Sequence, residues 1–222
     1  MAHFKGKLTT GQGYFCIIKK YTDESTGDEY ALKELKKEKY TNQEYRYRLL
    51  REIKLLGDLQ GCENVVRLVS YGNDEHSEKL WYIMPLAQSN LYDFIRKNSS
   101  KLTISNKFEI AGQVINAIKY AHERNILHRD ISPNNVLIFI KANKIIVNVT
   151  DFGLGKDTAS LSYYTGSSVS GYGQILYVAP EQRAKLKDST VKSDIYSLGK
   201  LLILFLLIKT QTTSDHLSYQ LW

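Results

Sequence analysis

Two carboxylates and an amide stand close together in the middle of this 222-residue chain. Asp130 and Asn135 belong to the string HRDISPNN (residues 128–135), and Asp151 opens the string DFG (residues 151–153). Carboxylate and amide oxygens are hard donors, the kind of ligand that a cation bound to phosphate prefers. The residue types and their spacing therefore indicate one pocket that surrounds a phosphate group.

The first part of the chain predicts a small sheet with one prominent helix. Short runs rich in Tyr, Phe, Ile and Leu are separated by a polar turn cluster at 23–28, and a later apolar row repeats at helical spacing. We expect strands at 8–20, 28–35, 65–71 and 80–84 and a helix at 43–59. This part of the chain ends at Pro85.

Beyond residue 85 helical periodicity dominates. In one long segment apolar residues repeat at helical spacing, at Phe108, Ala111, Val114, Ile115, Ile118 and Ala121. We expect helices at 90–97, 105–123 and 195–208, strands at 136–139 and 145–149, and a long loop at 157–173.

The most apolar segment, residues 195–208, is too short to cross a membrane. A span needs about 20 predominantly apolar residues, whereas this run contains Gly199 and Lys200. A helix of this length that is apolar all round is expected in the middle of a helical lobe. No membrane span is therefore expected.

Composition indicates a globular protein. With 43% hydrophobic and 24% charged residues, the chain can bury one substantial core or two small lobes. Cys16 and Cys62 are too few for a disulfide scaffold, and residues 1–7 do not form the charged and apolar regions of an export signal. The expected location is cytoplasmic.

The formal net charge of +7 leaves a nucleic-acid or acidic-membrane partner open, because a basic surface concentrates phosphates. Much of this charge lies in residues 33–54, where both signs are mixed as on a solvated helix face. A basic nucleic-acid module without catalysis would bind with strong salt dependence and without response to ATP. We expect no nucleic-acid partner.

Taken in order, several strings resemble the eukaryotic-type protein kinase family over residues 8–207, nearly the whole chain. They are TGQGYFCII (10–18) for the glycine-rich loop, YALK (30–33) for the third strand, LREIKLL (50–56) for the main helix, HRDISPNN and DFG for the catalytic centre, GQILYVAPE (173–181) for the end of the activation segment and SDIYSLG (193–199) for the central helix. Their order and spacing, more than any one motif, carry the resemblance.

The resemblance implies an α+β, two-lobed protein-kinase-like fold. Residues 1–85 would form an N-lobe, a small antiparallel sheet with one main helix that binds the nucleotide. Residues 86–222 would form a mainly helical C-lobe with the catalytic loop, the activation segment and the central helix. This lobe would lack the family's last helices, because the chain ends at Trp222 soon after the central helix.

The resemblance also implies the chemistry, which is transfer of the γ-phosphate of ATP to a protein hydroxyl. Asp130 would accept the proton of that hydroxyl, and Asn135 and Asp151 would bind Mg²⁺, or Mn²⁺ in its place. Lys33 would pair with the α- and β-phosphates and be held in place by Glu52. The residues expected to bind the nucleotide are Thr10, Gly11, Gly13, Ile18, Ala31, Lys33, Glu52, Met84, Ala87 and Leu137.

Further residues would support this site by resemblance. His128 and Phe152 are expected to be buried supports, and Asp194 is expected to anchor the backbone of the catalytic loop. Backbone groups of Leu86 and Ala87 would bond the edge of the adenine base.

Four positions depart from the family pattern. Cys16 stands where the family has the third glycine of its glycine-rich loop. Ser132 stands where members that phosphorylate Ser or Thr have a lysine, and Asn134 where tyrosine-directed members have an arginine. The loop thus lacks the cation that neutralises the moving phosphoryl group, and losing one such donor can cost about 100-fold to 1,000-fold in rate. Two readings stay open. One is an active, slow kinase that favours Ser and Thr, given Pro133; the other is a pseudokinase, also indicated by Gln174 where members have threonine.

The position of Glu181 pairs in family members with an arginine from a later helix. The chain ends before such a helix, so a naturally compact form and a truncated fragment both fit the sequence. We expect an exposed apolar face on the C-lobe, with marginal stability or self-association.

The protein substrate is not identified by the sequence. An upstream kinase or trans-autophosphorylation at the activation loop is expected, because the Arg129 guanidinium can pair with a phosphorylated side chain. Candidate acceptors are Ser160, Ser162, Tyr163, Tyr164, Thr165, Ser167, Ser168 and Ser170.

Overall fold

The computed structural model describes residues 4–152, 175–184 and 188–207. The chain divides into two compact units. The first unit comprises residues 1–61 and 66–87, and the second comprises residues 62–65 and 88–222.

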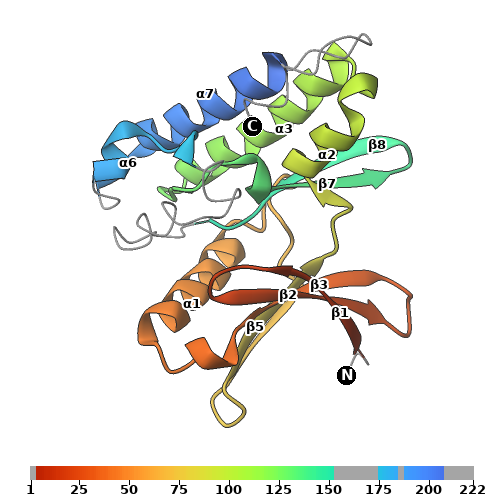
Figure 1. Ribbon diagram of the computed structural model, residues 1–222, viewed down its shortest axis with the longest axis vertical. Coiled ribbons are helices and arrows are strands. Elements are labelled where there is room, and N and C mark those ends of the chain that lie inside the picture. The colour runs from red at the N-terminus through yellow and green to blue at the C-terminus, as the bar shows by residue number, and fades with distance from the viewer. Residues whose placement is uncertain (1–3, 153–174, 185–187, 208–222) are drawn as a thin grey trace. The chain divides into compact units, whose positions relative to one another are not determined.

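The first unit is built on an antiparallel sheet with the strand order β1-β2-β3-β5-β4 (Figure 1). Its strands are β1 (Phe4–Gln12), β2 (Cys16–Asp23), β3 (Glu29–Leu35), β4 (Ser70–Asp74) and β5 (Lys79–Pro85), with a short 3-10 helix η1 (Lys37–Lys39) after β3. Residues 8–20 do not form the one strand that their apolar run predicts. They divide into β1 and β2, which agrees with the glycine-rich loop expected by resemblance at residues 10–18. Gly13 N donates to Cys16 O at 2.9 Å and closes a turn between them.

Helix α1 (Gln43–Asp58) packs against β3 and β5 (Figure 1). The helix begins where it does because the Asn42 side chain accepts a hydrogen bond from Glu44 N at 2.9 Å, which satisfies one of the unpaired N–H groups of the first turn. Leu49, Ile53 and Leu56 are buried on the face toward the sheet. The helix predicted at 43–59 is confirmed.

The strand predicted at 65–71 is wrong, because β4 begins only at Ser70. Val65 and Val66 are buried, yet neither belongs to a strand. Val65 instead forms an isolated bridge with Val149 inside the second unit. A short buried apolar run looks the same in the sequence whether or not it pairs along its length.

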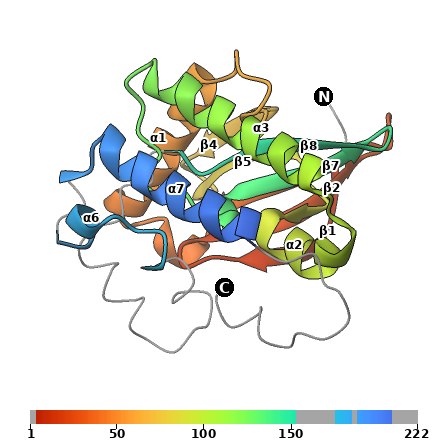
Figure 2. The same ribbon diagram turned by 90° about the horizontal axis from the view of Figure 1, so that it is seen from above.

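The second unit combines helices with a small antiparallel sheet of order β6-β7-β8. Its elements are β6 (Ser89–Asn90), α2 (Leu91–Asn98), η2 (Ser99–Lys101), α3 (Ile104–His122), η3 (Pro133–Asn135), β7 (Val136–Lys141), β8 (Lys144–Val149), α6 (Pro180–Ala184) and α7 (Val191–Leu207). Helix α3 packs on β8 and runs beside α7 (Figure 2). The helices predicted at 90–97 and 105–123 and both predicted strands are confirmed within a few residues.

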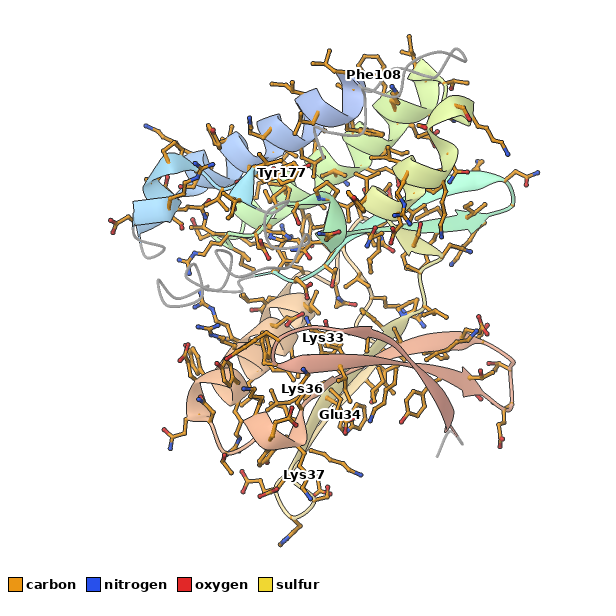
Figure 3. The ribbon with its side chains drawn as sticks, viewed as in Figure 1. Lys33, Glu34, Lys36, Lys37, Phe108 and Tyr177 are labelled. Carbon is orange, nitrogen blue, oxygen red and sulfur yellow. The ribbon has the colours of Figure 1, made fainter. Side chains whose placement is uncertain are left out.

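Helix α3 begins with a reciprocal cap in which Thr103 and Asn106 bond each other's backbone N–H. Its buried face carries Ile110, Ala111, Val114, Ala117, Ile118 and Ala121. Phe108, which the predicted apolar row includes, is 63% exposed and lies on the outer side of the helix (Figure 3). Helical spacing alone therefore does not bury Phe108.

Helix α7 does not bury all of its apolar surface among the described residues. Leu201 and Phe205 are fully buried, whereas Ile195, Ile203 and Leu207 are more than half exposed. The prediction that this helix is covered on every side is therefore wrong, and the expected exposed apolar face is present. Within the described ranges, no helix is long and apolar enough to cross a bilayer.

Gly72 is the position in β4 where a side chain would not fit. A Cβ atom there would lie 2.7 Å from the indole ring of Trp81, its partner on β5. We expect Gly72→Ala to lower the free energy of unfolding by about 1–3 kcal/mol through this overlap.

Gly112 provides the matched control, because it lies within α3 and a Cβ atom there would meet nothing within 4 Å. Gly112→Ala should raise the free energy of unfolding by about 0.5–1 kcal/mol, since alanine is the better helix former. Urea denaturation of both variants tests the pair. Equal midpoints for Gly72→Ala and wild type would contradict the close packing of Trp81.

Candidate functional site

A row of paired residues crosses the sheet of the first unit. Gly11 lies opposite Ile18 on β2, and Ile18 lies opposite Lys33 on β3. Lys33 in turn lies opposite Tyr82 on β5. Residues directly opposite on antiparallel strands project to the same face, so Ile18, Lys33 and Tyr82 share one face of the sheet.

Two more predicted nucleotide contacts lie on that same face. Ala31 is two residues from Lys33 and lies opposite Met84, and both are buried. Just beyond β5, Leu86 N donates to Glu29 O at 3.1 Å. The Leu86 N–H is thus bonded within the first unit, and the contact of the Leu86 and Ala87 backbone with the base stays a prediction.

Lys33 and Glu52 form the predicted ion pair. Lys33 Nζ lies 2.7 Å from Glu52 Oε1 and 3.0 Å from Oε2, and the two residues are 7% and 0% exposed. Tyr82 donates its hydroxyl to the same Oε1 at 2.7 Å. A buried carboxylate needs such donors to compensate its lost hydration, so Glu52 holds the ammonium group in one position. The sequence analysis missed Tyr82.

An aromatic cluster joins the turn after Gly13 to helix α1. Phe15 stacks on Tyr45 with ring centroids 5.6 Å apart and planes 9° apart, and Tyr14 meets Tyr45 edge-on at 5.8 Å. Lys39 Nζ lies over both tyrosine rings, at 4.7 Å and 5.7 Å from their centroids. These contacts hold the predicted phosphate-binding turn against the helix that carries Glu52.

The predicted catalytic loop is held by Asp194, at the start of α7. Asp194 is 1% exposed, and it accepts hydrogen bonds from His128 N and Arg129 N, each at 2.8 Å. His122 Nε2 lies 2.9 Å from the same carboxylate. The predicted anchoring of the loop by Asp194 is confirmed, and His122 is a partner that the sequence analysis missed.

His128 fixes the two ends of the loop to each other. Asp130 N donates to His128 Nδ1 at 3.2 Å, so the ring hydrogen is on Nε2, which donates to Thr150 O at 2.9 Å. The His128 and Phe152 rings lie 4.7 Å apart, and both residues are fully buried. Their predicted role as buried supports is confirmed.

Asn135 connects the remaining polar residues. Its Nδ2 donates to Asp130 O at 2.7 Å and to Asp130 Oδ2 at 3.1 Å. Its backbone N donates to Ser132 O at 3.0 Å, and its backbone O accepts from Thr150 N at 3.0 Å. Because Asp151 follows Thr150, these bonds connect Asn135 both to Asp130 and to the residue before Asp151.

The donor set around Asn135 fits a magnesium ion. Because Nδ2 donates to Asp130, Oδ1 is the atom of the amide that a cation would take. Asp151, whose neighbour Thr150 bonds the Asn135 backbone, would supply a carboxylate oxygen. Within the described ranges, no group of three His, Cys, Asp or Glu gathers as a closed metal site. Two protein oxygen ligands together with phosphate oxygens are the usual arrangement for Mg²⁺.

Two residues of this loop region adopt backbone conformations that favour glycine. Arg129 has φ of +67° and Asp151 has φ of +65°. Such conformations cost of order 1–3 kcal/mol each and persist where surrounding bonds impose them. For Arg129, the bond to Asp194 is that constraint.

Leu137, the predicted contact from the second unit, is half-buried on β7.

Helix α6 adds contacts that the sequence did not indicate. Ser193 donates its hydroxyl to Glu181 Oε1 at 2.6 Å, and this bond lowers the pKa of the Glu181 carboxyl. Gln182 is 1% exposed and donates to Arg129 O at 3.3 Å and to Ser189 Oγ at 3.1 Å. Gln182 thus connects α6 to the catalytic loop.

Gln174 and the predicted phosphate acceptors lie outside the described residues.

Comparison with known proteins agrees with this geometry. The model of the family described as "Protein kinase domain" matches residues 4–220. Calcium-dependent protein kinase 9 of Arabidopsis thaliana is 32% identical over 89% of this chain, and mitogen-activated protein kinase 5 of the same plant is 31% identical over 85%. The chain spans 35% and 48% of the lengths of these two relatives.

A yeast protein is similar in both sequence and structure. Serine/threonine-protein kinase RAD53 of Saccharomyces cerevisiae is 32% identical over 84% of this chain, which covers 21% of that protein. A crystal structure of Rad53 in complex with AMP-PNP matches with a TM-score of 0.67 and 27% identity, covering 98% of this chain and 52% of that one. The predicted two-lobed kinase fold class is confirmed.

Removal of Lys33 should destabilise the first unit strongly. Breaking a buried ion pair costs about 3–5 kcal/mol, and we expect about 3 kcal/mol for Lys33→Met because Tyr82 still donates to Glu52. The partly exposed pair between Lys19 and Glu34 is the matched control, and Lys19→Met should cost at most about 1 kcal/mol. Chemical denaturation measures both losses. Equal losses would show that burial of the Lys33 pair has no energetic consequence.

Asp194→Asn should loosen the catalytic loop. The amide keeps one acceptor oxygen and turns an NH₂ group toward an N–H donor, so we expect a loss of about 2–3 kcal/mol in the free energy of unfolding. Asp188→Asn, on an exposed residue, should stay within about 0.5 kcal/mol of wild type. Hydrogen exchange at His128 and Arg129 reports the local effect. Unchanged protection of these two amides would refute the anchoring role.

Proposed function

The chain belongs to the protein kinase domain family, and on that premise we propose that it transfers the γ-phosphate of ATP to serine or threonine hydroxyls of proteins. The observation that carries the proposal is the arrangement around Asn135, whose amide bonds Asp130 while its backbone bonds the residue before Asp151. A base and two metal-binding oxygens are thereby connected within one loop region.

In this proposal Asp130 is the catalytic base. The acceptor oxygen bonds to the γ-phosphorus as the bond from that phosphorus to the β,γ-bridging oxygen breaks; the hydroxyl proton passes to Asp130, and ADP leaves. Asn135 Nδ2, at 3.1 Å from Asp130 Oδ2, orients the carboxylate. Asn135 Oδ1 and Asp151 would hold Mg²⁺, or Mn²⁺, which neutralises charge on the phosphates.

The first unit would bind the rest of the nucleotide. Lys33, oriented by Glu52, would pair with the α- and β-phosphates, since an ammonium group on a flexible stem needs an acid to position it. The backbone of Thr10, Gly11 and Gly13 would approach the phosphates. The remaining proposed contacts are Ile18, Ala31 and Met84 on the shared sheet face, Ala87 beside the base, and Leu137 from the second unit.

The relatives support ATP as donor and Ser or Thr as acceptor. The similar yeast protein is named a serine/threonine-protein kinase, and its solved structure contains AMP-PNP. The Ser-Pro-Asn-Asn string of residues 132–135 supports the same preference. We propose protein substrates, with control by an upstream kinase or by trans-autophosphorylation.

A pseudokinase is the second candidate function. Ser132 favours it, because the loop from Asp130 to Asn135 contains no cation for the transferred group. The intact pair of Lys33 and Glu52 and the kept metal-binding positions favour catalysis instead. The two readings differ in one observable, which is phosphate transfer that depends on Asp130.

Asp130→Asn should abolish phosphate transfer while ATP binding is kept. Wild type, Asp130→Asn and the exposed control Asp93→Asn are incubated with radiolabelled ATP, Mg²⁺ and casein. We expect incorporation by wild type and by Asp93→Asn, and a loss of at least about 100-fold in Asp130→Asn, the lower end for losing a catalytic base. ATP binding by wild type without Asp130-dependent incorporation would establish the pseudokinase reading.

A further inference from the structure

Two buried hydroxyl groups in the described part of the chain have no hydrogen-bond partner. They are Ser132 Oγ and Thr150 Oγ1, on residues that are 1% and 4% exposed. A buried hydroxyl without a partner loses its hydration and gains nothing in return, so it destabilises the fold unless a ligand bonds it.

Both residues are attached to Asn135. Asn135 N donates to Ser132 O, and Thr150 N donates to Asn135 O, each at 3.0 Å. The two unsatisfied hydroxyls therefore lie in the loop region that holds Asp130 and the proposed metal ligands, and nowhere else among the described residues. This shared placement is the one expected of groups that bond a ligand there.

Other buried serines of the second unit satisfy their hydroxyls within the protein. Ser197, 3% exposed, donates its hydroxyl to Ser193 O at 3.1 Å. Ser193, fully buried, donates to Glu181. Ser189 accepts from Gln182. Burial alone therefore does not leave a serine hydroxyl unpaired in this unit. The unpaired hydroxyl of Ser132 needs a specific explanation.

The groups around Ser132 narrow the choice of ligand. Asn135 Nδ2 is already committed to Asp130, and the Asp130 carboxylate is an acceptor. The loop from Asp130 to Asn135 contains no Lys or Arg, and the side chain of Asn134 is only half-buried. Ser132 is thus the buried side chain of this loop that has a hydroxyl hydrogen to donate, and a phosphoryl oxygen is the charged acceptor that the proposed reaction brings there.

We propose that Ser132 is a catalytic residue that donates a hydrogen bond from Oγ to an oxygen of the phosphoryl group during its transfer. The inference rests on the proposed kinase function. Ser132 keeps its proton throughout, while the proton of the acceptor hydroxyl goes to Asp130. A neutral donor in a buried site stabilises developing charge without the desolvation that a buried ammonium group requires.

The test compares two buried serines that differ in whether their hydroxyl has a partner. Ser132→Ala and Ser197→Ala are each measured for thermal unfolding and for steady-state transfer from ATP to casein, beside wild type. Ser132→Ala should lower kcat by about 10-fold to 100-fold, the range for a hydrogen bond to a charged group, with little change in the KM for ATP. It should not lower the melting temperature, since it removes an unsatisfied group.

Ser197→Ala should behave in the opposite way, with a lower melting temperature and an unchanged kcat, because its hydroxyl bonds only the helix backbone. Ser132→Lys supplies a second probe: it should fold and reach at least the wild-type kcat if the side chain faces a phosphoryl group. A lysine that faces the protein interior would instead unfold the second unit.

The outcomes separate the inference from the function on which it rests. Wild-type kcat in Ser132→Ala, or a fall in its melting temperature like that of Ser197→Ala, overturns the role of Ser132 and leaves the kinase proposal standing. Absence of transfer by wild type overturns the kinase proposal, and the role of Ser132 falls with it.

Discussion

The buried Asp194 carboxylate imposes the constraint on which the second unit's site depends. Two consecutive backbone N–H groups, of His128 and Arg129, reach one carboxylate, and the left-handed conformation of Arg129 accompanies that arrangement. His128 is thereby set where its ring bonds both Asp130 N and Thr150 O. The catalytic loop and the segment before Asp151 are thus aligned by one acid at the start of α7. An acid with this many donors is compensated for its burial.

The first unit also contains a buried carboxylate, and it has a different role. Glu52 is also a fully buried carboxylate, and it is compensated by Tyr82 and by Lys33. In the second unit the buried acid holds backbone N–H groups, whereas Glu52 in the first unit holds the ammonium group of the long Lys33 side chain. In both cases a buried carboxylate would be destabilising alone. Its hydrogen-bond donors come from separate elements of the unit, so the carboxylate fixes those elements relative to each other.

The sequence predicted elements best where periodicity was clean, and it predicted contacts where a family motif contained both partners. Helices α1 and α3 and strands β5, β7 and β8 were recovered. The run at 65–71 was misassigned, because burial without pairing has the same apolar pattern as a strand. Asp130 and Asn135, five residues apart, could be placed together from their motif. The contacts of His122 with Asp194 and of Gln182 with Arg129 could not, because each depends on helix packing that no local pattern encodes.

The stacking of Phe15 and Tyr14 on Tyr45 makes the turn and helix α1 one thermodynamic unit. Tyr45 and Glu52 lie on the same helix, so a rotation of α1 moves the turn and the partner of Lys33 together. A ligand that orders the turn then favours the helix orientation in which Glu52 reaches Lys33. By reciprocity, a protein that binds α1 in that orientation raises the affinity of the turn for its ligand by the same factor.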